Sequence, residues 1–392
     1  MDEPRPIRYG VIGTGMMGVE HIENVNALDD AVVTAVSDTN AESLDDGTRI
    51  AAGDDGVPVA TFVDHRDLLA SGLCDAVVIA TPNFTHVDVL PDALAAPVHV
   101  MIEKPLCTTV ADCERVIQLA SDRPDGWITW MAMEYRYMPA AAELIRHVHG
   151  GVVGRPRMVA IREHRFPFLA KVDDWNRFSE NTGGTLVEKT CHFFDLMNLV
   201  LRERPVRVMA SGAQDVNHLD ESYDGRVPDV LDNAFVIVDY PSGARALLDL
   251  CMFADATHEQ EEMAVTGELG KVEARLPSNT VHVGRRGDHW IGRVETYTAD
   301  DDRIEYQGHH HGSSFLEHSE FTEAIRTGGR PTVTLADGYW AVAAGAAAHR
   351  SIELGRPVEL SELMDADIAR ATLDQVGPDA GRDARASEVG GA

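Results

Sequence analysis

The first third of the chain alternates short apolar runs with segments of helical periodicity, and this alternation limits the fold more than any other feature. It is the pattern of parallel strands joined by crossover helices. The expected strands are Arg8–Ile12, Val32–Ser37, Val59–Phe62, Ala76–Ala80, Val98–Ile102 and Ile128–Met133, and the expected helices are Met16–Leu28, His65–Ala70, His86–Ala95 and Thr109–Ser121. The sequence therefore predicts an α/β domain with a doubly wound parallel sheet, which we place at residues 1–125.

After Pro139 the pattern changes to one helix, ending near Val148, and then to strand-like runs with few helices between them. These runs are Val206–Ser211, Asn233–Tyr240, Ala244–Phe253, Glu262–Thr266, Lys271–Arg275 and Thr280–Val283, and helices are expected near Leu186–Leu201, Ser314–Arg326 and Asp337–Leu354. The hairpin signal Tyr240-Pro241-Ser242-Gly243 separates two runs and indicates antiparallel neighbours. Residues 126–376 are thus predicted to form an α+β domain with a large, mostly antiparallel open sheet, and residues 377–392 a disordered tail.

A glycine motif, Gly13-Thr14-Gly15-Met16-Met17-Gly18, follows the first expected strand and opens the first helix. In this context G-x-G-x-x-G gives a tight turn, close backbone approach to a pyrophosphate, and a helix N-terminus facing the phosphates. Asp38 ends the second strand twenty residues after Gly18. Its carboxylate would bind ribose hydroxyls and repel a 2′-phosphate, which favours NAD over NADP. The alternative is that Asp38 is one more surface acid in an acid-rich chain.

Two further segments follow strands of the same domain, Ala80-Thr81-Pro82-Asn83 and Glu103-Lys104-Pro105. Ligands of open α/β sheets bind outside the carboxyl ends of the strands. Thr81, Pro82, Asn83, His86, Glu103 and Lys104 therefore join the glycine motif and Asp38 as expected cofactor-binding residues of a Rossmann domain. The ammonium of Lys104 could also stabilise a developing alkoxide. A solvated surface lysine is the alternative.

The segment Asn181 to Asp195 contains the second chemical signal. If one helix starts near Gly183-Gly184, Glu188 and His192 are i and i+4 on one face, and Asp195 follows at i+7. A carboxylate beside an imidazole tunes a general acid/base toward neutral pH. The alternative is a helix that buries its apolar residues and carries an incidental polar stripe.

Composition excludes other classes of function. The net charge is -30, with 64 acidic residues against 34 lysines and arginines, so a basic face for nucleic acid is not expected. Dense acids instead predict adaptation to high salt. Five cysteines without a CxxC pair, no basic and apolar leader, and no apolar run of membrane-spanning length predict a cytoplasmic protein. His309-His310-His311 and His318 lack further adjacent ligands, so a loop near the substrate pocket is expected rather than metal.

These segments together resemble the Gfo/Idh/MocA family of oxidoreductases. The resemblance extends from the glycine motif through Ala80–Asn83 and Glu103–Pro105 to Gly183-Gly184 and to Ala336-Asp337-Gly338 before an alanine-rich helix. It implies a Rossmann domain, a second domain whose open sheet makes a homodimer or homotetramer, and hydride transfer between NAD and a secondary alcohol of a sugar, cyclitol or related polyol.

The resemblance also assigns roles to residues. The family's lysine falls on Lys104 and its Asp-x-x-x-His pair on Glu188 and His192, with glutamate in place of the usual aspartate. His192 would take the hydroxyl proton, Lys104 would polarise the oxygen, and Glu188 would orient His192 or bind a neighbouring hydroxyl. The expected substrate residues are Arg136, Arg162, His164, Trp175, Lys189 and Asp195. A nucleotide-sensing regulatory protein and an NAD-dependent, redox-assisted glycosidase remain alternatives.

Overall fold

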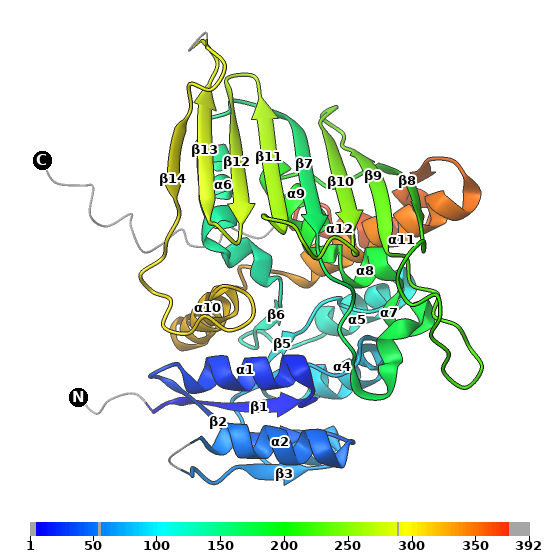
Figure 1. Ribbon diagram of the computed structural model, residues 1–392. Coiled ribbons are helices and arrows are strands. Elements are labelled where there is room, and N and C mark those ends of the chain that lie inside the picture. The colour runs from blue at the N-terminus through cyan, green and yellow to red at the C-terminus, as the bar shows by residue number, and fades with distance from the viewer. Residues whose placement is uncertain (1–4, 54–55, 288–289, 376–392) are drawn as a thin grey trace, which may run out of the picture.

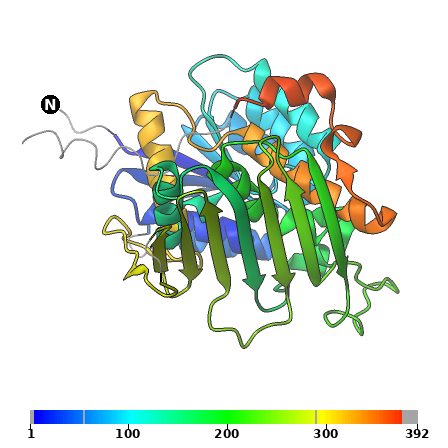
Figure 2. The ribbon, with the colours of Figure 1, turned by 90° about the horizontal axis from the view of Figure 1, so that it is seen from above.

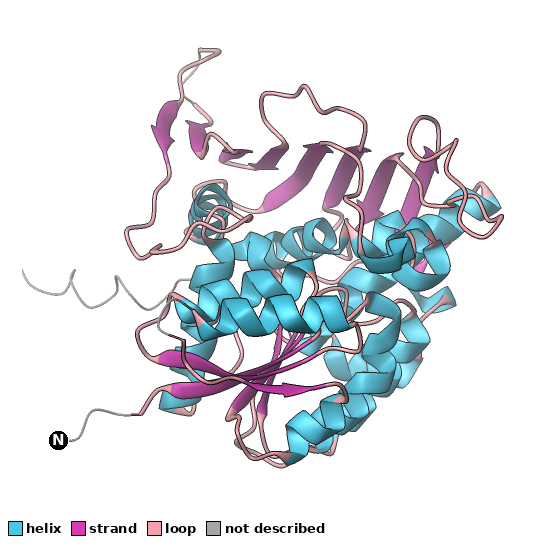
Figure 3. Cartoon of the chain, turned by 60° about the horizontal axis from the view of Figure 1, so that its bottom comes forward, coloured by secondary structure: helices cyan, strands magenta, loops and turns pink. Residues whose placement is uncertain are grey.

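A computed structural model describes residues 5–53, 56–287 and 290–375, and the predicted disordered tail at 377–392 lies outside the described residues. Two sheets dominate it, with helices layered between and around them (Figures 1 and 3). The fold is built by two local patterns, crossover helices in the first part of the chain and hairpins in the second.

The first sheet has six parallel strands in the order β3-β2-β1-β4-β5-β6. Its elements are β1 (Ile7–Ile12), α1 (Met16–Asn26), β2 (Ala31–Ser37), α2 (Ala41–Ala52), β3 (Ala60–Phe62), α3 (His65–Ala70), β4 (Ala76–Ile79), η1 (Asn83–Thr85), α4 (His86–Ala95), β5 (His99–Ile102), α5 (Val110–Ser121) and β6 (Thr129–Met131). The predicted doubly wound sheet is confirmed. Strand β6 lies beyond residue 125, where the sequence places the domain boundary, yet it pairs with β5.

Helix α2 is absent from the predicted elements because its apolar face is narrow. Only Gly47 and Ala51 are buried in it. The helix is defined at its start by Asn40, whose side chain accepts a hydrogen bond from the N–H of Ser43. Such a cap marks a helix start even where the hydrophobic pattern is weak.

The second sheet has nine strands in the order β14-β13-β12-β11-β7-β10-β9-β8-β15, side by side in Figure 2. They are β7 (Pro156–His164), β8 (Arg207–Ala213), β9 (Asn233–Asp239), β10 (Arg245–Cys251), β11 (Glu261–Gly267), β12 (Gly270–Leu276), β13 (Thr280–Arg285), β14 (Glu295–Thr298) and β15 (Val358–Glu359). Each pairing is antiparallel except that of β7 with β10. The predicted large, mostly antiparallel sheet is confirmed.

The remaining helices lie on one face of this sheet and connect it to the first domain (Figure 3). They are η2 (Glu134–Tyr137), α6 (Pro139–His149), η3 (Val172–Arg177), α7 (Ser179–Thr182), α8 (Thr185–Glu188), α9 (Cys191–Leu201), α10 (Ser313–Thr327), α11 (Leu335–Leu354), η4 (Leu360–Glu362) and α12 (Ala366–Thr372). Helix α11 packs on β8 and also on α5 and β6 of the first domain. The two domains therefore share a packed junction.

Strand β7 is the central strand that the sequence pattern does not predict. Val159, Ile161 and Glu163 are buried on its inner face, while Arg162 and His164 point to the other face. A charged residue at an inward position interrupts the apolar alternation by which a half-buried strand is recognised. Glu163 is nevertheless 0% exposed, so it faces the interior beside the domain junction.

Candidate active site

The glycine motif forms the turn between β1 and α1, and its three glycines meet different surroundings. Gly13 has φ +91°, and a Cβ there would lie 2.6 Å from the backbone of Ala80. A Cβ on Gly18 would overlap the carbonyl oxygen of Gly13, so α1 packs closely on the strand. A Cβ on Gly15 would meet nothing within 4 Å. Gly13 and Gly18 are thus required by packing, and Gly15 faces open space.

Asp38 lies at the carboxyl end of β2, beside this turn. Its Oδ2 accepts a hydrogen bond of 2.7 Å from the N–H of Thr14, and its Oδ1 accepts one of 2.8 Å from the N–H of Asn40. The hydroxyl of Thr14 donates to the carbonyl of Ser43. The carboxylate is thereby held at the mouth of the glycine turn.

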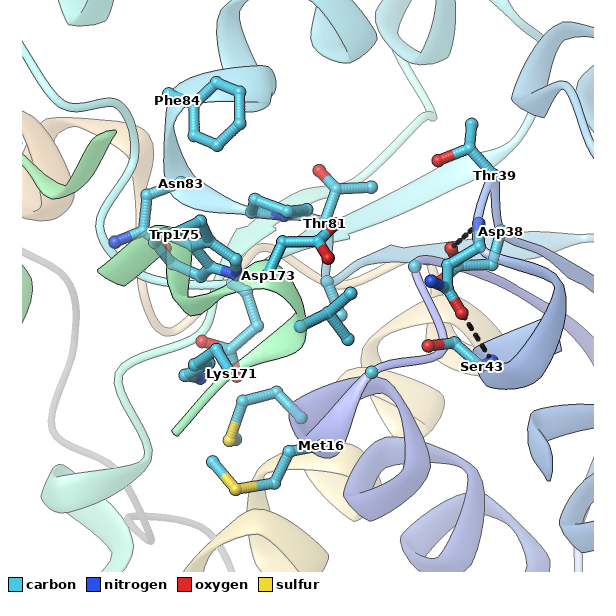
Figure 4. Close-up of a pocket in the computed structure, with 18 of the residues that line it drawn as sticks. Met16, Asp38, Thr39, Ser43, Thr81, Asn83, Phe84, Lys171, Asp173 and Trp175 are labelled. Carbon is cyan, nitrogen blue, oxygen red and sulfur yellow. Dashed lines mark hydrogen bonds between the residues drawn. The ribbon is translucent and has the colours of Figure 1, made fainter. Parts of the chain in front are cut away.

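A cavity of about 410 Å³ extends along the carboxyl ends of β1, β2, β4 and β5. Figure 4 shows Asp38, Thr39 and Ser43 at one end and Phe84, Trp175 and Lys171 at the other. Of the expected cofactor residues, those that line it are Gly13, Gly15, Met16, Met17, Asp38, Thr81, Pro82, Asn83, Glu103 and Lys104. The cavity therefore follows the edge of the sheet that the sequence indicates.

Three expected cofactor residues do not line this cavity. Thr14 and Gly18 are buried in the packing of the turn. His86 is 0% exposed, with Nδ1 3.0 Å from the carbonyl of Pro105 and Nε2 3.1 Å from the carbonyl of Thr81. The expectation that His86 contacts the cofactor is corrected. Its buried ring instead joins the backbone at Thr81 to the backbone at Pro105, outside the lining of the cavity.

The residues present fit a dinucleotide. Helix α1 begins at Met16, and its N-cap residue Gly15 provides no side-chain cap, so the N–H groups of the first turn remain available to phosphate oxygens. Asp38 offers a carboxylate to ribose hydroxyls at one end, and Lys104 lines the same cavity. The gap beside Gly15 gives a pyrophosphate direct access to the backbone.

A second cavity of about 390 Å³ adjoins the first and shares with it Met16, Met17, Lys104, Lys171 and Glu188. The other residues around it are Glu20, Tyr135, Met138, Arg165, Phe166, Phe168, Leu169, Asn176, Lys189, His192, Gln260, Glu261, His309, His310 and His311. Lys104 and Glu188 thus line both the cavity along the strand ends and the one that is rich in polar groups. A molecule in the second cavity would therefore lie beside a ligand in the first.

Lys104 follows β5, where its backbone N–H donates to the carboxylate of Glu103. Burial disfavours its ammonium charge, but Cys191, Glu103 and other nearby groups outweigh burial and raise the pKa of Lys104 above its usual value. Burial raises the pKa of Glu103, but the hydrogen bond from His21 outweighs burial and lowers this pKa to about 2. The site therefore presents a permanent ammonium group to a ligand oxygen.

His192 lies near the start of α9, with its ring stacked on Tyr135 at a centroid distance of 4.1 Å. Its Nε2 is 3.5 Å from Oε1 of Glu134. Burial, and then the charges of Lys104 and Lys189, hold the pKa of His192 well below its usual value. At neutral pH the ring is neutral and can accept a proton.

The expected pairing of Glu188 with His192 is wrong. The predicted single helix is divided into α8 and α9 at Lys189 and Thr190, which breaks the i, i+4 relation. Glu188 instead accepts a hydrogen bond of 2.8 Å from the side chain of Asn83. Glu188 therefore joins the second domain to the strand-end loop of β4, and the carboxylate nearest His192 is Glu134.

Lys189, an expected substrate residue, lines the second cavity, and its ammonium group already has partners within the protein. Its ammonium lies 2.9 Å from Oε1 of Glu163 and donates to the hydroxyl of Tyr135 at 2.7 Å. Burial lowers the pKa of Lys189. The lysine thus anchors the ring on which His192 stacks.

Arg136 and Asp195 line neither cavity, which corrects the expectation that they contact substrate. The Arg136 guanidinium donates two hydrogen bonds to Asp195, of 2.6 and 2.5 Å, and lies 3.3 Å from Asp337. Both side chains are 1% exposed. The pair is part of the buried packing between η2, α9 and α11.

Three other expected substrate residues lie elsewhere. Arg162 and His164 are on the outer face of β7, where they pair with Glu262 and Asp249. The alternation of β7 turns both away from the cavity, so their assignment is corrected. Trp175 lines the first cavity and not the second, with its ring 6.2 Å from that of Phe84.

Several residues around the site escape sequence reasoning. Glu134 and Tyr135 lie in η2, a single short 3₁₀ turn. Such a turn is too short for a hydrophobic period to show which of its side chains face the cavity. Lys171 directly precedes η3, in which Asp173 and Asp174 have φ 53° and 50°, a conformation that concentrates at functional sites. His309, His310 and His311 line the second cavity, and the described residues contain no group of three or more metal-ligating side chains suited to a metal ion.

Known proteins share this architecture. A family profile described as "Oxidoreductase family, NAD-binding Rossmann fold" matches residues 7–125, and one described as "Oxidoreductase family, C-terminal alpha/beta domain" matches residues 145–360. Myo-inositol 2-dehydrogenase of Thermotoga maritima is 29% identical over 91% of this chain and 100% of its own length.

Solved structures of dehydrogenases have a similar fold. The structure of a probable dehydrogenase from Thermotoga maritima matches with a TM-score of 0.73 and 26% identity over 91% of this chain and all of that one. Levoglucosan dehydrogenase in complex with NADH matches with a TM-score of 0.78 and 19% identity, over 91% of this chain and 99% of that one. At that identity the second likeness concerns the fold. The cofactor of the first domain is NAD.

Proposed function

The chain belongs to the Gfo/Idh/MocA oxidoreductase family, and on this basis we propose that it oxidises a secondary alcohol of a sugar, cyclitol or related polyol with NAD as acceptor. The observation that carries the proposal is the junction of the two cavities at Lys104, with the neutral imidazole of His192 in the second. Bound NAD⁺ supplies the hydride acceptor, C4 of its nicotinamide ring.

The residues of the second cavity perform the acid–base part of the reaction. His192 accepts the hydroxyl proton at Nε2, and the ammonium of Lys104 stabilises the developing alkoxide. Tyr135 keeps the imidazole plane fixed by stacking. Glu188, anchored by Asn83, accepts a hydrogen bond from a neighbouring hydroxyl of the substrate.

A substrate screen tests the proposal. Myo-inositol, levoglucosan and a panel of aldoses are supplied with NAD⁺ or NADP⁺ at low and molar KCl, since the net charge of -30 favours activity at high salt. Net accumulation of NADH with a polyol is expected. Release of free sugar from a glycoside without net NADH would favour redox-assisted glycoside hydrolysis, and NAD binding without any turnover would favour a nucleotide sensor.

His192→Ala separates catalysis from binding. Loss of the base is expected to lower turnover about 10²–10⁴-fold, with NAD affinity unchanged by calorimetry. His282→Ala, on the outer face of β13, is the matched control. In the wild type, kcat/KM is expected to stay level as the pH falls to the usual histidine value and to decline only below it, because the pKa of His192 is depressed. Unchanged turnover in His192→Ala would contradict the assignment.

The outer face of the nine-stranded sheet supports assembly of the chain as a homodimer or homotetramer. Exposed apolar side chains gather on this face at Met158, Met209, Phe235, Ile237 and Leu247, and exposed apolar patches mark interfaces. Light scattering is expected to give a dimer or tetramer for the wild type and a smaller species for Phe235→Glu. A monomeric wild type would contradict this proposal.

We also propose that this chain is a cytoplasmic protein. Cys74, Cys107, Cys113, Cys191 and Cys251 are all free thiols, which suits a reducing compartment. Among the described residues no helix is long and apolar enough to cross a membrane.

A further inference from the structure

His192 is buried except where it lines the second cavity, so a substrate in that cavity closes the direct route of its proton to solvent. His192 is 2% exposed, and its Nδ1 is buried without a hydrogen-bond partner among the described residues. Stacking on Tyr135 covers one face of the ring. Its Nε2 faces the carboxylate of Glu134 at 3.5 Å, so a proton on His192 either returns to the substrate or passes to Glu134.

Glu134 is a buried carboxylate that the reaction described above does not use. It is 2% exposed, and neither of its oxygens has a hydrogen-bond partner in the described part of the chain. Burying such a group without partners costs stability and calls for an explanation. Its Oε1 lies 3.5 Å from Nε2 of His192 and 3.7 Å from Nε2 of His310. One oxygen therefore stands between two imidazole rings.

His310 extends this contact toward the surface. Its side chain is 22% exposed, and its Nδ1 lies 2.9 Å from Oε1 of Glu20 in α1. Glu20 is itself 2% exposed, so the bond fixes the histidine with Nε2 directed to Glu134. His310 is the member of the chain of contacts that reaches water.

We propose that Glu134 and His310 form a proton relay that connects His192 to solvent. The inference rests on the proposed dehydrogenase function, whose proton it carries. As the C–H electron pair leaves as hydride to the nicotinamide, the hydroxyl proton passes to Nε2 of His192. The imidazolium gives that proton from Nε2 to Oε1 of Glu134, and the neutral carboxyl gives it to Nε2 of His310. His310 then releases it from Nε2 to water, while its Nδ1–H stays on Glu20. One proton enters and one leaves, which restores all three side chains.

The electrostatics of these groups suit the direction of transfer. Burial raises the pKa of Glu134, so its carboxyl holds a proton that His192 releases readily. Burial lowers the pKa of His310, but the hydrogen bond to Glu20 and the charge of Glu134 outweigh burial and raise it. The other titratable groups that act on or respond to Glu134 are Glu103, Lys104, Tyr135, Cys191 and Glu317.

The two gaps of 3.5 and 3.7 Å exceed hydrogen-bond length. Catalytic hydrogen bonds are often long in ligand-free proteins and tighten when substrate is bound. The relay needs each gap to close by less than about 1 Å to reach the usual range. The carboxylate of Glu134 can turn toward either ring, because no hydrogen bond from the described residues holds it.

Glu134→Gln in the full chain tests the relay, because the amide has nearly the same shape but cannot carry a proton. With the polyol that the wild type oxidises, kcat is expected to fall roughly 10²-fold. The solvent isotope effect should rise and the primary isotope effect of a deuterated substrate should shrink, because proton release becomes limiting. Glu134→Asp should recover part of the rate, and formate should accelerate Glu134→Ala.

Glu317→Gln is the matched control. Glu317 is a buried carboxyl near Glu134 that lines neither cavity and accepts hydrogen bonds from Trp130 and the N–H of Met133. Its replacement is expected to leave both isotope effects unchanged. A loss of rate in Glu134→Gln with unchanged isotope effects and no rescue by formate would overturn the relay, since a merely structural role predicts that result.

A second readout needs no turnover. In the ligand-free protein, NMR titration of His310 is expected to show a lower pKa in Glu134→Gln than in the wild type, because the carboxylate charge that faces Nε2 is gone. An unchanged titration would overturn the relay even if the enzyme is active. If no polyol is oxidised by the wild type, the proposed function fails, whereas a shifted His310 titration still confirms the contact.

Discussion

The charge of Asp195 provides a sharp test of the distinction between packing and site residues. Asp195→Asn keeps the shape of the side chain and removes the counterion of Arg136, where both side chains are 1% exposed. Arg136 then keeps the carboxylate of Asp337 at 3.3 Å and a hydrogen bond of 3.4 Å to the carbonyl of Thr332. Arg204 already lies 2.9 Å from the other oxygen of Asp337. An arginine stays charged in such a site, so the variant leaves a poorly compensated buried cation.

Breaking a buried ion pair from one side costs about 3–5 kcal/mol. The remaining contact to Asp337 places the expected loss at the lower end, about 3 kcal/mol. In a domain of this size each kcal/mol corresponds to about 2–4 °C in Tm, so a decrease of roughly 6–12 °C is expected by scanning calorimetry. The KM values for NAD and for the polyol should stay unchanged at temperatures where the variant is folded.

Two variants serve as controls. Arg136→Met combined with Asp195→Leu removes both charges and leaves the Arg204–Asp337 pair in place, so most of the lost stability should return. Glu353→Gln removes one partner of an exposed pair with Arg350, which contributes less than about 1 kcal/mol. An unchanged Tm together with a raised KM for the polyol in Asp195→Asn would refute the reasoning and return Asp195 to the substrate site.

Further expectations concern the cofactor loop and the second cavity. Asp38→Asn removes the charge that opposes a 2′-phosphate, so the kcat/KM ratio of NADP to NAD should rise about 10–100-fold; an unchanged ratio would place the ribose elsewhere. Gly15→Ala should weaken NAD binding without lowering Tm and Gly18→Ala should lower Tm, as their surroundings require; the reverse pattern would contradict the packing. The pKa of Glu261 is raised to about 7, mainly because its carboxyl is buried. The free energy of unfolding should therefore decline by about 3 kcal/mol as the pH rises from about 4.5 through 7. Glu261→Gln should abolish this decline. Glu262→Gln, on the outer face of the same strand, should retain it.

The parts of the fold that follow from local pattern could be predicted from the sequence. Strand and helix alternate visibly before residue 133, and the hairpin at Tyr240–Gly243 is specified by its own residues. Ligands of open α/β sheets bind outside the carboxyl ends of the strands because of the topology of the sheet. The sequence alone could therefore predict that Asp38, Thr81 and Lys104 line one cavity. Strand β7 could not be found, because buried Glu163 breaks its apolar face.

The second half of the site depends on details that sequence periodicity does not report. The break between α8 and α9 separates Glu188 from His192, although their spacing suits one helical face. The 3₁₀ turn η2 directs Tyr135 to the cavity and Arg136 into the interior. A polar side chain at either position is consistent with a ligand site, and only packing decides that Tyr135 lines the cavity and Arg136 does not.

The central claim is that this chain moves a hydride from a polyol carbon to NAD. The polyol oxidised in the substrate screen, deuterated at the carbon that becomes the carbonyl, is incubated with the wild-type protein and NAD⁺, and the nucleotide is analysed by mass spectrometry. The account predicts one deuterium at C4 of each NADH formed. Unlabelled NADH, or release of the deuterium to water, would contradict it.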